Sequence, residues 1–69
     1  MTSVQMIAKE EMVERFLDSA SRGDLANVST MISHSSQLLN ESGRQGWTGL
    51  MLAARNGHFD VVKALLLNG

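Results

Sequence analysis

The chain has 69 residues, of which 43% are apolar and only 4% aromatic, and its net charge is −1. A chain this short forms one small domain, because it buries only roughly 60% of the surface that its unfolded form exposes. The lack of cysteine excludes disulfide bonds, and Lys and Arg residues that are scattered rather than gathered in a stripe argue against binding to nucleic acid.

The first 35 residues are predicted to hold an N-terminal extension followed by a pair of helices. The mildly apolar lead Met1–Lys9 is expected either to extend the first helix or to drape over this first unit. It does not match a secretory signal, which needs a positively charged start and a longer apolar core. Glu11 and Arg15 lie four residues apart and can pair on one helix face. We interpret the acidic residues of this helix as a solvated face rather than a metal or acid–base site. They are Glu10, Glu11, Glu14 and Asp18.

A glycine and an aspartate separate the two helices of this first unit. Gly23 is required by the turn, and Asp24 is a good N-cap for the helix that follows. The polar, serine-rich segment 36–46 is then predicted to be a linker, in which Leu38 packs back on the helices. Its glycines supply the turn residues.

The last part of the chain, 47–69, is predicted to form helix, tight turn, helix and stop. Thr48 precedes an apolar run, so that its hydroxyl can accept from the free N–H groups of the first helical turn. A short helix over Leu50–Ala54 is followed by Gly57, for which we expect a positive φ, and a second helix begins at Phe59. Apolar residues of the second helix recur at spacings of three and four, as is typical of a buried face. They are Val61, Val62, Leu65 and Leu66.

The two parts are related by an internal repeat. When Gly23 is aligned with Gly57, which follows it by 34 residues, Val28 falls on Val62 and small or apolar residues coincide elsewhere. A short antiparallel pair of helices cannot cover its own apolar face, so units of this kind stack on one another.

The segment Gly46–Gly69 resembles, almost letter for letter, one ankyrin repeat that lacks its last few residues, and the period of that family is about 33 residues. The upstream unit resembles an N-terminal capping repeat, in which polar residues replace apolar ones. The resemblance implies an all-α, ankyrin-type helix-turn-helix solenoid fragment of about four short antiparallel helices. It divides the chain into an extension with a capping repeat (1–35), a linker with a hairpin finger (36–46) and a truncated repeat (47–69).

Two positions depart from the family pattern. The Thr-Pro-Leu-His tetrad of the family appears here as Thr48-Gly49-Leu50-Met51. Gly49 replaces a proline that pre-sets the first helical dihedral, so we expect the start of the helix to be loosened by up to about 1 kcal/mol. Met51 fills the space of the histidine but cannot donate its hydrogen bond.

The resemblance implies a module that binds another protein and is not an enzyme, with no catalytic residue, cofactor or metal. The only imidazoles, His34 and His58, belong to no carboxylate pattern typical of a zinc site or of a nucleophile with its base. His58 occupies the structural Gly-His pair of the family, which indicates a packing role. We expect neither nucleic acid nor a membrane as a partner, and an intracellular, cytoplasmic location, because neither a secretory signal nor cysteine is seen.

In ankyrin repeats, partners meet the finger and the exposed side of the first helix. The matching residues here are Arg44, Gln45, Trp47, Arg55 and Asn56, with Ser21 and Arg22 as weaker counterparts in the capping repeat. Trp47 is the sharpest of these predictions, because tryptophan and arginine dominate interface hot spots. Its alternative is a packing role against the linker.

Two other functions stay open. The chain can be a regulatory or targeting module of a larger enzyme, such as a kinase or ubiquitin ligase, whose catalytic part lies outside it. It can also be a self-assembling structural unit, because the last helix pair leaves an apolar edge that is otherwise exposed. Arrays generally need about three repeats for stability, which favours self-association or completion by further repeats.

Overall fold

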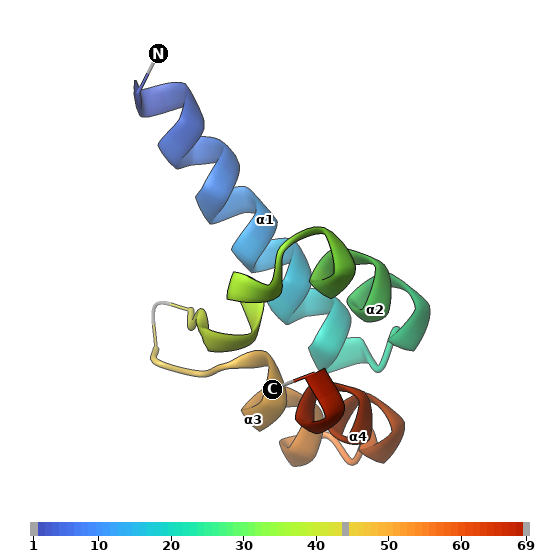
Figure 1. Ribbon diagram of the computed structural model, residues 1–69. Coiled ribbons are helices and arrows are strands. Elements are labelled where there is room, and N and C mark those ends of the chain that lie inside the picture. Colours follow the sequence, from blue (N-terminus) through green and yellow to red (C-terminus); the bar gives the residue numbers. More distant parts are fainter. Residues whose placement is uncertain (1, 44, 69) are drawn as a thin grey trace.

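In the computed structural model, four α-helices and one 3-10 helix follow one another in the described residues, 2–43 and 45–68, with side chains described from Lys9 onward (Figure 1). The elements are α1 (Thr2–Arg22), α2 (Leu25–His34), the 3-10 helix η1 (Ser36–Asn40), α3 (Gly49–Arg55) and α4 (Phe59–Asn68). The predicted all-α fold of helical pairs is thereby confirmed. None of these helices is both long and apolar enough to cross a membrane.

The longest helix is α1, with 21 residues. Its N-terminal part extends beyond the other helices, whereas its C-terminal part packs among them (Figure 1). The apolar lead therefore continues the first helix from Thr2, one of the two predicted arrangements, while Met1 lies outside the described residues. Glu11 and Arg15 form the predicted ion pair on its exposed side.

Both helical pairs turn at equivalent glycines. Gly23 and Gly57 have φ values of +77° and +76°, a conformation that residues with a side chain rarely adopt. The helix after each predicted cap begins as expected. The Asp24 carboxylate and the Thr48 hydroxyl each accept from the backbone N–H three residues later, at 3.2 and 3.3 Å. The caps and the positive φ of Gly57 are thus confirmed.

One apolar core lies between the two helical pairs. Helix α1 packs against α3, and α2 packs against α4. Phe16, Val28 and Val61 are fully buried at this interface. The buried apolar residues are Val13, Phe16, Leu17, Ala20, Val28, Ile32, Leu38, Ala53, Val61 and Leu65. Stacking therefore covers the apolar faces that neither helical pair covers alone.

The first residue of α3 lies against α1. A Cβ atom built on Gly49 would lie 2.7 Å from Phe16 Cε2 and 3.4 Å from Ala20 Cβ. The first distance is shorter than carbon atoms in proteins approach one another. A proline at this position would carry the same Cβ, so the glycine in the tetrad is explained by the packing of the Phe16 ring.

The predicted linker 36–46 begins with η1, an element that the sequence pattern did not indicate. Leu38 is buried in the core, so its predicted packing against the helices is confirmed. No side chain caps η1 at Ser35. A five-residue turn without a cap has little local support, and the burial of Leu38 supplies its stabilisation.

A tight hairpin follows η1 and leads into α3. Ser42 and Thr48 form an isolated antiparallel bridge, and the Gly43 N–H donates to the Trp47 carbonyl at 3.0 Å. Gly46 takes a φ of +79° in the turn between them. The backbone of Trp47 is thereby tied to the linker immediately before α3 begins.

Candidate functional site

The strongest candidate for a functional site is a group of three side chains on and just before α3. Met51 and Arg55 lie one helical turn apart and share a face of the helix. Met51 is 50% exposed, Arg55 is exposed, and Trp47 is half-buried. We call Trp47, Met51 and Arg55 the α3 row.

Arg55 stacks on the ring of Trp47, with its Cζ atom 5.1 Å from the ring centroid. A guanidinium over a tryptophan face is attracted by about 0.5–1 kcal/mol at an exposed site. The contact restricts a side chain that is otherwise long and mobile. The row therefore joins the tryptophan and the arginine that the sequence singled out separately.

Ser21 and Asn56, two further predicted contact residues, are joined to each other. The Asn56 side-chain amide donates to the Ser21 carbonyl and to the Ser21 hydroxyl, both at 2.9 Å. These bonds connect the C-terminal end of α1 to the residue that caps α3. Ser21 and Asn56 therefore hold the two helical pairs together, at the residue that directly follows Arg55.

The other predicted contact residues are not joined to the α3 row by any hydrogen bond or ion pair among the described residues. Gln45 is exposed in the hairpin turn. The Arg22 guanidinium pairs with Asp18 at 2.9 Å on α1. Arg44 lies outside the described residues. Met51, for which the sequence predicted only a space-filling role, belongs to the row, and its spacing of four from Arg55 was the available signal.

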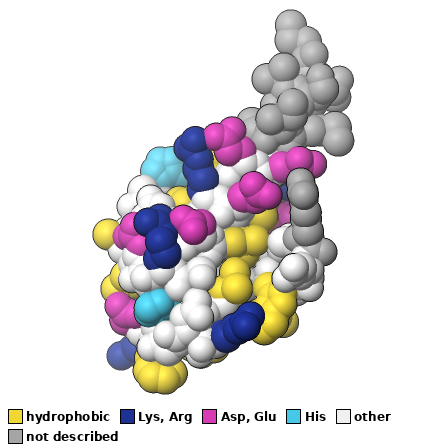
Figure 2. Space-filling view, turned by 180° about the vertical axis from the view of Figure 1, so that it is seen from behind, with side chains coloured by type: hydrophobic (Ala, Val, Ile, Leu, Met, Phe, Trp, Pro, Cys, Tyr) yellow, Lys and Arg dark blue, Asp and Glu magenta, His cyan; other side chains and the backbone are white. Residues whose placement is uncertain are grey.

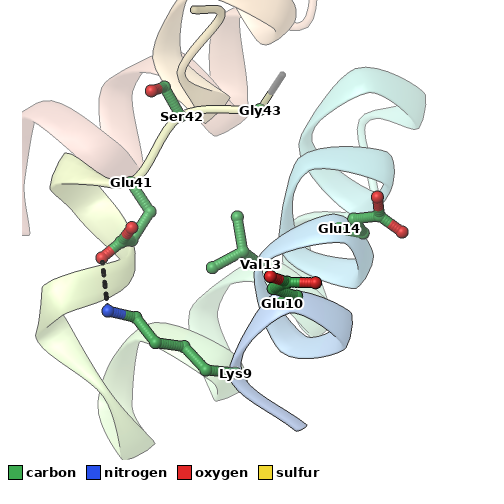
Figure 3. Close-up of a pocket in the computed structure, with 7 residues that line it drawn as sticks. All are labelled: Lys9, Glu10, Val13, Glu14, Glu41, Ser42 and Gly43. Atoms are coloured by element: carbon green, nitrogen blue, oxygen red, sulfur yellow. Dashed lines mark ion pairs between the residues drawn. The ribbon is translucent and has the colours of Figure 1, made fainter. Parts of the chain in front are cut away.

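A second feature is an open groove of about 530 Å³ between α1 and the strand-like segment after η1 (Figure 3). Val13 lies at its centre, and Lys9 Nζ lies 3.6 Å from Glu41 Oε2 at one end. It is lined by Lys9, Glu10, Val13, Glu14, Glu41, Ser42 and Gly43. Three carboxylates against one ammonium make the groove acidic, and Figure 2 shows acidic side chains gathered beside an apolar patch on one face.

A third feature is the apolar edge of the second helical pair, formed by the exposed side chains of Phe59, Leu66 and Leu67 on α4. Ile32, which faces this pair, is only 5% exposed, whereas its repeat equivalent Leu66 is 63% exposed. Leu67 and Phe59 are also exposed. Of the face predicted to be buried on α4, Val61 and Leu65 are buried, but Val62 is half-buried and Leu66 lies in solvent.

Each of the two histidines lies close to a backbone group of another residue. The His58 ring lies against Gly23, where a built Cβ would be 2.6 Å from Nδ1, and His34 Nδ1 lies 2.9 Å from the Thr30 carbonyl. Within the described ranges, no three His, Asp or Glu side chains are placed to hold a metal ion.

Comparison with known proteins agrees with this architecture. A family model described as ankyrin repeats (many copies) matches residues 16–66. The protein named NAD-capped RNA hydrolase NUDT12 is 49% identical to the whole chain over 69 residues in Homo sapiens, Macaca fascicularis and Pongo abelii. The chain spans only 15% of the length of each of these relatives. No solved structure matches the chain significantly.

Proposed function

This chain belongs to the ankyrin-repeat family, and on that basis we propose that it is a non-catalytic module that binds another protein. The α3 row carries the proposal. Trp47 and Met51 leave apolar surface exposed beside a stacked arginine. Tryptophan and arginine contribute more than other residues to interface hot spots. The fully buried apolar residues, in contrast, hold the helices together and cannot reach a partner.

The proposed contact surface extends from the α3 row to the hairpin and the C-terminal end of α1. Gln45 and Arg22 are exposed and can touch a partner at the rim of this surface, and a contact through Arg44 stays a prediction from the sequence. Ser21 and Asn56 support the row, because the hydrogen bonds between them fix the end of α3 against α1.

Capture of partners from a cell lysate on the immobilised chain tests this function. The variants are Trp47→Ala and, as a matched control, Lys63→Ala, which removes an exposed residue of α4 outside the row. We expect Trp47→Ala to reduce the captured proteins at least about tenfold, because a central tryptophan contributes roughly 2 kcal/mol or more. Helicity and melting should stay nearly unchanged.

Two results would contradict the proposal. Equal losses of stability and capture would assign Trp47 to the core. Unchanged capture by Trp47→Ala, with helicity preserved, would move the interface away from the α3 row.

A second function, as an accessory module of an enzyme, is favoured by the named relatives. They are called NAD-capped RNA hydrolases, and this chain corresponds to 15% of their length. Of the two roles, targeting and regulation, we propose targeting, in which the chain directs such an enzyme without touching the RNA, since its net charge is −1 and its groove is acidic.

A domain exchange tests the accessory role. The matching region of the human relative is either deleted or replaced by this chain, and hydrolysis and partner capture are measured in parallel. We expect hydrolysis by the purified enzyme to change less than about twofold on deletion, because the module does not form the active site, and partner capture to return with this chain. A turnover that falls with deletion and returns with the chain would oppose a role limited to targeting.

We further propose that the isolated chain self-associates through the apolar edge, which we define as Phe59, Leu66 and Leu67. The exposed Leu66 at a position whose repeat equivalent, Ile32, is buried supports this. We also propose a cytoplasmic location, because a small chain without cysteine suits a reducing compartment. Imaging of a fluorescent fusion tests the location, and sedimentation tests the self-association.

A further inference from the structure

The basic side chains of this protein differ in what neutralises them. Lys9 lies 3.6 Å from a carboxylate oxygen of Glu41, Arg22 lies 2.9 Å from one of Asp18, and Arg15 pairs with a glutamate. Arg55 and Lys63 form no ion pair with any described acidic residue. Of these two, Arg55 alone is held in place, because its guanidinium lies over the Trp47 ring.

Stacking leaves the binding capacity of Arg55 intact. The attraction of a cation to an aromatic ring is electrostatic and needs no hydrogen-bond acceptor, so it does not use up the five N–H donors of the guanidinium. These donors match the two oxygens of a carboxylate and can form a bidentate pair. Because Trp47 already restricts the side chain, less conformational entropy is lost when an anion binds.

The surroundings of Arg55 limit the kind of anion that fits. Met51 exposes half of its surface one turn away on the same face, so the cation borders an apolar patch. A single carboxylate beside an apolar side chain meets complementary surface here, whereas a polyanion such as nucleic acid would find one cation in the row and a net charge of −1 on the chain.

We propose that the α3 row binds a protein segment in which an Asp or Glu carboxylate pairs with Arg55 while a neighbouring apolar side chain packs on Met51 and Trp47. This inference rests on the proposed function of the chain as a protein-binding module, and it names the chemistry of the partner.

Selection of random 12-residue peptides displayed on phage against the full chain tests the inference. We expect the enriched peptides to share an acidic residue next to an apolar one. A synthetic version of one enriched peptide is then titrated against the wild type, Arg55→Gln, Arg55→Lys, Trp47→Ala and the control Lys63→Gln by fluorescence anisotropy, and an oligouridylate is titrated in the same way. Circular dichroism verifies that each variant is folded.

Arg55→Gln should weaken binding of the peptide at least about tenfold, because it removes the charge-assisted pair. The affinity of Arg55→Lys for the peptide should lie between those of the wild type and Arg55→Gln, because an ammonium cannot form the planar bidentate pair. Lys63→Gln should bind the peptide as the wild type does. Replacing the acidic residue of the peptide by its amide should cause the same loss, and the two changes together should cost little more than either alone.

The possible outcomes separate the inference from the function beneath it. Peptides that lose binding with Trp47→Ala but not with Arg55→Gln would overturn the carboxylate inference and leave the binding module standing. Enrichment of Lys- or Arg-rich peptides that ignore Arg55 would assign recognition to the acidic groove instead. An oligouridylate that binds in an Arg55-dependent way would replace the protein partner by nucleic acid. No enriched peptide at all would count against both the inference and the function.

Discussion

Replacement of Gly49 by alanine is expected to destabilise the protein, although alanine is the better helix former. At an unstrained helical position, glycine to alanine stabilises by about 0.4–1 kcal/mol. The added Cβ would, however, lie 2.7 Å from Phe16 Cε2 and 3.2 Å from Phe16 Cζ, and the Phe16 ring is fully buried. Overpacking of a core costs about 1–3 kcal/mol. The net loss in the free energy of unfolding should therefore be about 1–2 kcal/mol. In a domain of this size, each kcal/mol lowers Tm by roughly 4–8 °C.

Urea denaturation followed by circular dichroism measures this loss in a double-mutant cycle with Phe16→Leu. Leucine lacks the ring atoms that the new Cβ meets, so Gly49→Ala should cost little or even stabilise in that background, with a coupling of about 1 kcal/mol or more. The matched control is Gly57→Ala. No atom lies within 4 Å of a Cβ built there, but φ is +76°, so Phe16→Leu should not relieve the cost. A stabilised Gly49→Ala protein, or an equal cost of Gly49→Ala in both backgrounds, would refute the packing argument.

Three further predictions concern the turn, the bond between the helical pairs and the apolar edge. Gly57→Asn should cost less than Gly57→Ala, which loses roughly 1–2 kcal/mol, because asparagine tolerates the left-handed conformation better; equal thermal midpoints for the two variants would contradict this. Asn56→Ala should lose about 1 kcal/mol in urea denaturation, because it removes both hydrogen bonds to Ser21, and an unchanged midpoint would show that these bonds add nothing. The isolated chain should melt at a low temperature that depends on its concentration, and Leu66→Gln with Leu67→Gln should make it sediment as a monomer. A cooperative, concentration-independent melt above about 70 °C would oppose that reasoning.

The sequence by itself determined the features whose causes lie within one or two turns of the chain. A cap depends on one side chain and the N–H groups that follow it, so Asp24 and Thr48 were identified correctly. A positive φ depends on the absence of a side chain, so Gly57 was predicted from its place between two apolar runs. The repeat spacing predicted the pairing of units, and the family resemblance predicted the all-α fold that the family match confirms. Which predicted residues contact a partner stays a prediction.

Only the tertiary structure decided which side chains meet across the two helical pairs. Leu65 follows Val61 by four residues, and Leu66 follows Val62 by the same spacing. Leu65 is nevertheless buried and Leu66 lies in solvent, because burial depends on what stacks against each side of the helical pair. The contact of Arg55 with Trp47, and that of Asn56 with Ser21 across 35 residues, likewise follow from how the hairpin and α1 are placed. Local patterns specify a helix face, but a contact between faces depends on the packing of whole elements, and that packing is set by the summed burial of the core.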